Sequence, residues 1–248
     1  MKEFLIFRLY GPMAAWGEIA VGEYRPSSMH PSKSAVLGLV ASALGISRGD
    51  KETLDAITEA YGFATFVEAS GTHLRDYHTI QVPGARRGAI YATRKDELDA
   101  RGKDGTRDLN TILSTRDYRC DALYTGCLWS LSPDAPFSVE VIRNALEKPR
   151  YALYLGRRSC PLALPLEAQV MEADTFDQAV AKVKFKSEEF LKRLKMNDMI
   201  SVHWDRGAES RLQSTQAVPR RDISRDRRMW RFSERIEHQT GIDRKRES

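Results

Sequence analysis

The sequence predicts an α+β fold whose first 165 residues form a modified ferredoxin-like domain. Three observations lead to this prediction. The expected elements follow the order β-α-(α)-β-β-α-β, which is typical of that fold. The apolar residues of the expected helices recur at helical spacing. A charged stretch separates the two central strands. With 248 residues, of which 42% are hydrophobic, the chain can fill a sizeable core.

The expected elements of the first part begin with a buried strand over residues 3–10, which ends at Gly-Pro. After an irregular loop, Ser32 can cap a helix that runs to Gly45. Asp50 can cap a second helix over residues 51–61, and a short strand over 63–67 follows.

The central strands are expected over residues 74–82 and 122–131, and we expect them to pair with each other. The stretch from 83 to 112 between them is punctuated by glycine and rich in charge. It has too little apolar content to build a core of its own, so it is either disordered or a functional protrusion.

The later elements begin with a helix that Ser138 can cap and that ends near Lys148. Residues 166–239 are expected to form a smaller β-rich lobe, and residues 240–248 a disordered tail. The periodicity within this lobe predicts strands near 167–171, 199–204 and 229–237 and helical structure within 175–196.

The charge of the chain points to an acidic partner. The net charge is +5, and basic residues gather in two late segments, 143–158 and 219–248, where they alternate with aromatic residues. Such a mixture suits phosphate contacts beside base stacking. Solvated strand edges with extended arginines explain it equally well.

Cysteine usage and apolar stretches bear on the location of the protein. The three cysteines form neither a C-x-x-C pattern nor an even disulfide framework, so we expect a reducing cytoplasm. The longest apolar stretch, residues 35–46, is too short to span a bilayer, so we expect no membrane partner.

Four stretches together resemble one family. They are Gly-Pro-Met-Ala-Ala-Trp-Gly at 11–17, the segment from Arg25 to Gly45, Leu-Arg-Asp-Tyr-His-Thr at 74–79, and the segment from Lys148 to Leu162. Their order and spacing are similar to those of the CasD subunits of the type I-E CRISPR Cascade surveillance complex, within the fifth Cas family of the RAMP superfamily. The resemblance covers residues 1–165 and is looser beyond them.

The resemblance implies an RRM-like core with a β-hairpin thumb, inserted at about residues 83–114. It further implies a non-catalytic, antiviral ribonucleoprotein subunit that grips the 5′ handle of CRISPR RNA. The implied partners are the guide RNA, the Cascade backbone subunit and the large subunit, with target DNA reached only through the complex. In such effectors base pairing by the guide reads the target, so the subunit need recognise only RNA end, shape and phosphates.

The candidate RNA-binding residues lie in the matched stretches and in the thumb. A helix that begins after Ser32 offers an anion site at its N-terminus. The turn at Gly156 permits close approach of a backbone and is followed by two arginines. The alternatives to RNA binding are purely structural roles, namely a simple helix cap, a surface turn and a polar strand face. The full set is Arg25, Ser32, Lys33, Ser34, Arg75, Tyr77, His78, Arg86, Arg87, Tyr91, Arg157 and Arg158.

Catalysis is not expected. The Lys-His dipeptide that the resemblance associates with the ribonuclease of a related subtype is absent, and the five histidines have no metal-ligand spacing. Tyr77 and His78 remain the best acid–base candidates. We therefore expect no catalytic residues, no metal and no cofactor. Two alternatives stay open, namely a metal-independent CRISPR repeat endoribonuclease and an adaptor without direct RNA contact.

Overall fold

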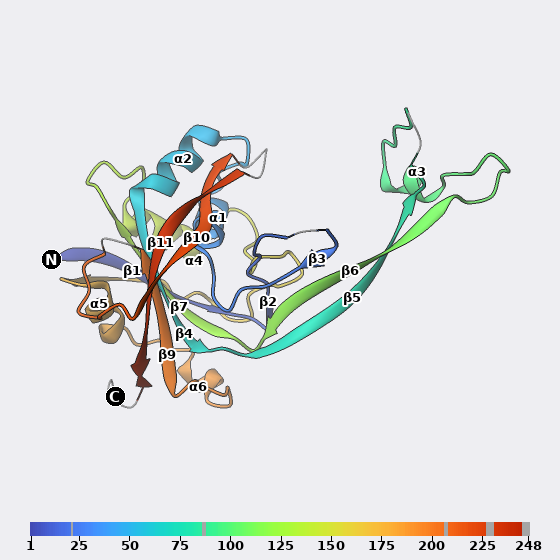
Figure 1. The fold of residues 1–248 in the computed structure, drawn as a ribbon. Helices are drawn as coiled ribbons and strands as arrows, with labels where there is room; N and C mark the ends of the chain where they lie inside the picture. The colour runs from blue at the N-terminus through green and yellow to red at the C-terminus, as the bar shows by residue number, and fades with distance from the viewer. Residues whose placement is uncertain (21, 86–87, 206–207, 227–230, 245–248) are drawn as a thin grey trace.

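The computed structural model describes residues 1–20, 22–85, 88–205, 208–226 and 231–244. Its helices and strands form the α+β fold that the sequence predicts (Figure 1). The main sheet has seven strands in the order β10-β11-β9-β4-β7-β1-β8, and a second, four-stranded sheet projects from it. Within the described residues, no helix is long and apolar enough to cross a membrane.

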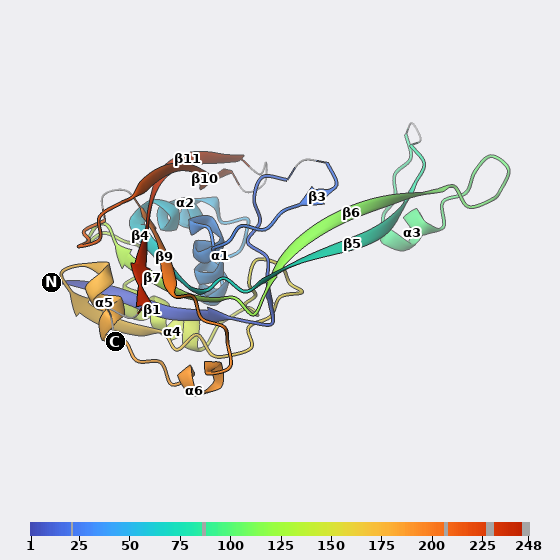
Figure 2. The same ribbon diagram turned by 60° about the horizontal axis from the view of Figure 1, so that its bottom comes forward.

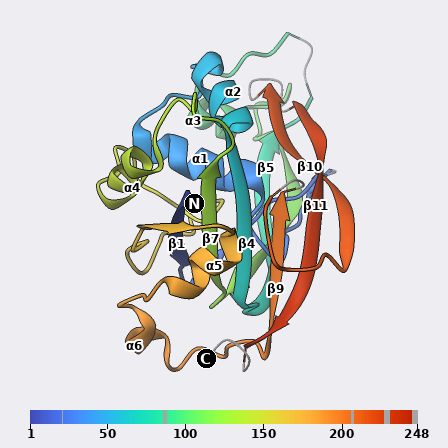
Figure 3. The same cartoon turned by 90° about the vertical axis from the view of Figure 1, so that its left-hand side faces the viewer.

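The core of the main sheet consists of β1 (Lys2–Tyr10), β4 (Tyr61–Ala69), β7 (Leu123–Ser130) and β8 (Gln169–Ala173), with antiparallel neighbours. Helices α1 (Lys33–Leu44), α2 (Lys51–Ala60) and α4 (Val139–Glu147) lie on one face of it (Figure 3). The side chains of Ser32, Asp50 and Ser138 cap these helices as predicted, and Gly45 ends α1 with a left-handed φ of 80°. A large apolar cluster fills the space between these helices and the sheet.

The opposite face of the sheet is also covered. The segment that carries α5 (Phe176–Lys182) and α6 (Glu188–Leu191) crosses it, and Phe176 stacks on Trp129 with ring centroids 5.7 Å apart. The helical periodicity predicted within 175–196 therefore forms two short helices rather than one. A second apolar cluster, around Phe176 and Trp204, seals this face from solvent.

The last strands extend the same sheet. They are β9 (Met199–Asp205), β10 (Gln216–Asp226) and β11 (Arg231–Asp243). The predicted β-rich lobe therefore shares its sheet with the first part, and the predicted domain boundaries stay a prediction. The predicted disordered tail is wrong for residues 240–243, because they pair with β9. Residues 245–248, and the first two residues of the strand expected at 229–237, lie outside the described part.

A long hairpin extends away from the main body. Its strands β5 (Thr72–Pro83) and β6 (Leu109–Cys120) pair along their whole length, and α3 (Arg94–Leu98) lies near the tip (Figures 1 and 2). The predicted pairing of residues 74–82 with 122–131 is wrong, because β7 lies between β1 and β4. Short strands β2 (Met13–Ala14) and β3 (Tyr24–Arg25) pair with β6 near the base.

A buried ionic cluster joins the start of α1 to the last three strands, of which β10 and β11 pass over α1 and α2 (Figure 2). The Lys33 ammonium lies 2.8 Å from the Asp205 carboxylate, and the Lys33 backbone N–H donates to Asp222 at 2.9 Å. Arg235 pairs with Asp205, Asp222 and Glu237. The cluster comprises Lys33, Asp205, Asp222, Arg235 and Glu237.

Two histidines extend this cluster. The rings of His30 and His203 stack with centroids 3.8 Å apart, and His30 Nε2 lies 3.3 Å from a Glu237 oxygen. Burial, aided by His30, lowers the pKa of His203 to about 3. Burial opposes the ionisation of Glu237, but the His30 hydrogen bond and the charges of Arg235 and Arg220 lower its pKa to about 2. His203 is therefore neutral and Glu237 ionised at neutral pH.

We predict that acid destabilises the protein through His203. Its folded pKa lies below the ordinary value of 6.5, so unfolding takes up a proton below pH 6.5 and stability falls as the pH drops toward 3. The folded pKa of Glu237 is also lowered, so this residue further reduces the stability as the pH falls below 4.5. Urea unfolding should show a loss of up to about 1.4 kcal/mol per pH unit from this histidine. His203→Gln should flatten the profile between pH 6.5 and about 5, and His78→Gln, at an exposed site, should not. An unchanged profile in His203→Gln would contradict this assignment.

Candidate nucleic-acid interface

A hollow with a volume of about 410 Å³ lies beside α1. Its walls are one face of α1, residues within 15–20 and 25–26 before it, residues within 46–54 after it, residues within 152–157, and Phe232 of β11. We call it the α1 groove. It brings together four of the residues predicted from the sequence to bind RNA, namely Arg25, Ser32, Ser34 and Arg157.

The shape of the groove follows from the small residues of α1. Gly38 and Ser42 lie on the lining face, so this wall has little side-chain bulk. The opposite wall is fixed because the Arg150 N–H donates to the carbonyl of Ala43 at 2.9 Å. Sequence reasoning missed three lining residues that suit a nucleotide: Arg48, Tyr154 and Phe232. Of these, only Tyr154 and Phe232 had a signal, since both lie in the two late segments where basic and aromatic residues are interspersed.

Lys33 and the N-terminus of α1 serve a different purpose from the predicted one. The Lys33 side chain is buried and paired with Asp205, and the Asp222 carboxylate accepts its backbone N–H. The helix N-terminus does bind an anion, as its dipole favours, but the anion is a carboxylate of the same chain. This geometry gives Lys33 a structural role and leaves Ser32 and Ser34 as the residues of this turn that line the groove.

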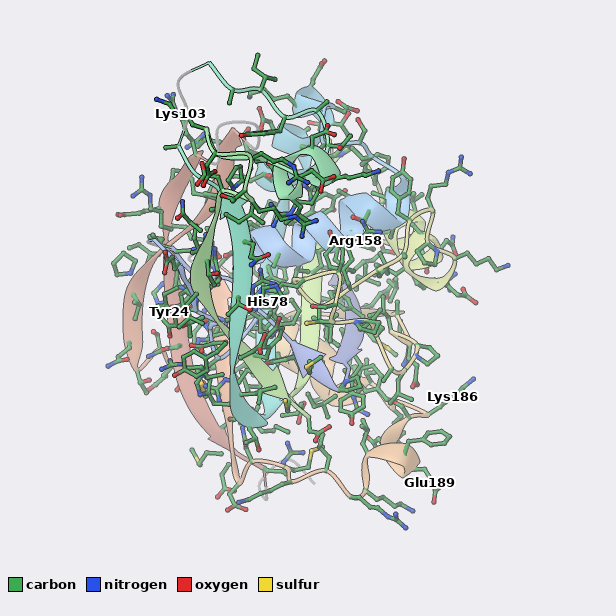
Figure 4. All side chains as sticks on the ribbon, turned by 90° about the vertical axis from the view of Figure 1, so that its right-hand side faces the viewer. Tyr24, His78, Lys103, Arg158, Lys186 and Glu189 are labelled. Carbon is green, nitrogen blue, oxygen red and sulfur yellow. The ribbon has the colours of Figure 1, made fainter. Side chains whose placement is uncertain are left out.

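The glycine-arginine turn is also partly structural. Gly156 has a φ of 84°, and a Cβ there would lie 1.9 Å from the Ala15 carbonyl oxygen, so the glycine is required by contact with the protein's own backbone. Arg157 donates to the carbonyls of Asp117 at 3.2 Å and Arg25 at 3.0 Å. Arg158 is exposed, on the side from which the hairpin projects (Figure 4).

The hairpin separates the three residues predicted on β5. Because side chains alternate along a strand, Arg75 and Tyr77 lie on one face of the ribbon and His78 on the other. Tyr77 is 65% exposed. Arg75 donates to both carboxylate oxygens of Asp117, at 2.9 and 3.2 Å. Tyr77 and His78 therefore cannot act together on one phosphodiester bond.

The tip of the hairpin carries exposed cations. Arg86 and Arg87 lie outside the described residues, and Tyr91 is half-buried. Thr93 and Asp96 form a reciprocal cap that begins α3, so the tip holds local structure that the sequence did not predict. The exposed cations of the described tip are Arg94, Lys95, Arg101, Lys103 and Arg107.

One group of residues resembles a metal site. The ligand atoms of His30, His203 and Glu237 lie within 4.8 Å of one another. However, the two rings stack with an interplanar angle of 18°, so their in-plane lone pairs cannot meet at one ion. Arg220 and Arg235 also lie beside Glu237 and would repel a cation. We therefore assign this group to the ionic cluster.

RRM-type domains stack RNA bases on an open sheet face. Here the segment with α5 and α6 covers that face with the apolar cluster around Phe176. The α1 groove is a concave surface with charged residues outside that face, and the base of the hairpin adjoins it through Arg25 and Arg157.

The comparisons with known proteins agree with one another. A family model described as CRISPR-associated protein (Cas_Cas5) matches residues 4–239. The curated protein "CRISPR system Cascade subunit CasD" of Escherichia coli (strain K12) is 41% identical over 174 residues, which cover 67% of this chain and 70% of that protein.

Two solved structures share the fold. A chain of a "CRISPR RNA-guided surveillance complex" matches with a TM-score of 0.64 and 23% identity, over 97% of this chain and 90% of that chain. A "Crystal structure of Cas protein" matches with a TM-score of 0.58 and 19% identity, over 98% and 96%. At these identities they support the fold alone. The family match and the curated relative confirm the resemblance predicted from the sequence, and the chain belongs to the Cas5 family of CRISPR-associated proteins.

Proposed function

We propose that this chain is a non-catalytic RNA-binding subunit of a type I-E Cascade complex and that it holds the 5′ handle of the guide RNA. The family and the CasD relative support membership of a Cascade complex. The observation that carries the RNA-binding role is the α1 groove, where Arg25 and Ser34 meet Arg157, which lies far from both in the sequence.

The chemistry of the groove suits one or more nucleotides. Its volume lies within the range of small-ligand pockets. Arg25 and Arg48 supply cations for phosphates, Tyr154 and Phe232 supply aromatic faces for bases, and Glu18 supplies an acceptor for base N–H groups. A groove that contacts phosphates as well as bases binds RNA with a strong salt dependence.

The fold supports an RRM-type core with a thumb. The strand order β4-β7-β1-β8, with crossovers through α1 and α4, is that of a ferredoxin-like unit. The β5–β6 hairpin fits the role of the thumb, which folds over RNA at the boundary between handle and spacer. In this proposal the backbone and large subunits of a cytoplasmic complex are its neighbours, and target DNA is reached through the complex.

The absence of catalysis belongs to the same proposal. It is supported by the opposite orientation of Tyr77 and His78 on the hairpin, which removes the best acid–base pair of the sequence. A metal-independent repeat endoribonuclease and an adaptor without RNA contact are the outcomes that the following tests would reveal.

The purified full chain should bind RNA of its own repeat handle, and the affinity should depend on exposed cations. We expect Arg48→Ala and Arg158→Ala each to weaken binding about 10-fold, the equivalent of one charge-assisted contact. Each should make the fall of log K with log salt concentration shallower, by about 0.7 in the slope. Lys186→Ala, at an exposed cation beside α6 (Figure 4), is the matched control. Fluorescence anisotropy across a salt series measures both quantities, and wild-type values in both arginine variants would exclude these contacts.

The same RNA should remain intact. Incubation of full-length repeat RNA with the protein, with and without magnesium, should give no specific cleavage on a denaturing gel. Protein-dependent cleavage that is lost in His78→Ala or Tyr77→Phe would replace the non-catalytic proposal with the ribonuclease alternative.

Removal of the hairpin tip should reduce RNA retention without affecting the folding of the protein. Replacing residues 86–106 with a short Gly-Ser linker leaves the pairing of β5 with β6 intact, because their paired residues lie outside the deleted segment. We expect an unchanged circular dichroism spectrum but reduced guide retention when the complex is reconstituted. Full guide occupancy with normal subunit stoichiometry would show that the tip is dispensable.

A further inference from the structure

A buried carboxylate lies at the base of the hairpin. Asp117 of β6 is 3% exposed, and three side chains reach it from the surface. Arg75 binds both of its oxygens, Tyr24 donates its hydroxyl proton at 2.5 Å, and His73 Nε2 lies 3.3 Å away. The Arg75 hydrogen bonds and those from Tyr24 and His73 hold the pKa of Asp117 well below its usual range, so it stays ionised.

Asp117 forms an ion pair with Arg75, so Arg75 is not an unbalanced cation. The pair is a cross-strand pair in register, and its two parallel hydrogen bonds fix the guanidinium plane. The positive charge is balanced at short range by a carboxylate of the same chain. Arg75 therefore offers RNA a flat, oriented surface rather than a net charge, although 44% of its side chain is exposed.

Tyr24 completes this surface. It lies on β3, opposite Thr115 of β6, and is 40% exposed. The Arg75 guanidinium carbon is 5.3 Å from the centroid of its ring, and Arg75 also donates to its hydroxyl at 3.0 Å. A half-exposed tyrosine that is held at its hydroxyl and has a guanidinium over its ring has few rotamers to lose when a ligand binds.

The support beneath these residues is rigid. Arg157 donates to the carbonyls of Asp117 and Arg25, and its guanidinium carbon lies 4.7 Å from the centroid of the Tyr118 ring. Arg157 and Arg25 also line the α1 groove, so the surface at Tyr24 continues from the groove toward the hairpin.

We propose that Tyr24 and Arg75 form a stacking platform for one unpaired base of single-stranded RNA as the strand passes from the α1 groove to the hairpin. Asp117 acts as a positioning residue, since it holds both members without touching the RNA. This inference rests on the proposed function. Aromatic and guanidinium planes stack any base, so the platform selects single-stranded RNA rather than a sequence.

The electrostatic consequence distinguishes this platform from an ordinary cationic contact. If RNA binding near Asp117 were only electrostatic, Asp117→Asn would strengthen binding, because it removes a negative charge. If the platform is correct, Asp117→Asn weakens binding and steepens the salt slope, because Arg75 becomes a free but disordered cation. Tyr24→Leu should weaken binding about 5- to 100-fold, the range for one stacked base, with an unchanged salt slope.

The test uses the full chain and RNA of its own repeat handle, in which each purine in turn is replaced by a fluorescent analogue that stacking quenches. The wild type should quench one position strongly. Tyr24→Leu and Asp117→Asn should abolish that quenching, while Tyr24→Phe, which keeps the ring, should retain most of it. Phe190→Leu, at an exposed aromatic residue of α6 outside the proposed RNA path, is the matched control and should quench as the wild type does.

Several outcomes would overturn the platform. Wild-type quenching in Tyr24→Leu, or tighter binding by Asp117→Asn, would show that no base stacks there. Thermal unfolding of each variant identifies misfolding, and Tyr24→Leu, which leaves the Asp117–Arg75 pair in place, remains informative if Asp117→Asn does not fold. If the wild type binds no RNA at all, the proposed function itself fails, and that result differs from binding without a platform.

Discussion

The buried ionic cluster at the start of α1 is the interaction on which the rest of the structure depends. Asp222 binds the helix N-terminus and Asp205 the Lys33 ammonium, so β9 and β10 are tied to the helix that forms one wall of the groove. Buried ion pairs add little net stability, but removing one partner costs about 3–5 kcal/mol. The cluster therefore specifies where the last strands dock more than how stable the protein is. It also fixes the loop before α1, because Arg220 of β10 donates to Ser28.

This arrangement divides the cations of the chain into two kinds. Lys33, Arg75 and Arg235 are balanced by carboxylates of the same chain and shape the surface. Exposed cations such as Arg48 and Arg158 supply the charge that a phosphate backbone can meet. Net charge alone does not reveal this division. A modest overall charge is thus compatible with RNA binding when the unbalanced cations lie around a groove.

Local rules were sufficient for much of the fold. Ser32, Asp50 and Ser138 cap their helices as predicted, because capping depends on neighbours in sequence. The strands β6 and β10 were missed because both are polar and lack an apolar face, and their pairing partners alone define them. The site was predicted in part for the same reason. Motif positions identified Arg25, Ser34 and Arg157, but the pairing of Lys33 depends on residues 172 and 189 positions away, which no local pattern contains.

The central claim is that guide RNA follows the α1 groove to the base of the hairpin. Ultraviolet crosslinking of the full chain to RNA of its own repeat handle, followed by mass spectrometry of the crosslinked peptides, tests it most directly. Aromatic residues that stack on bases should crosslink most readily. The account predicts crosslinks at Tyr24, Tyr154 and Phe232. Crosslinks confined to Phe190 of α6, which is 77% exposed and lies across the opposite face of the sheet, would contradict it.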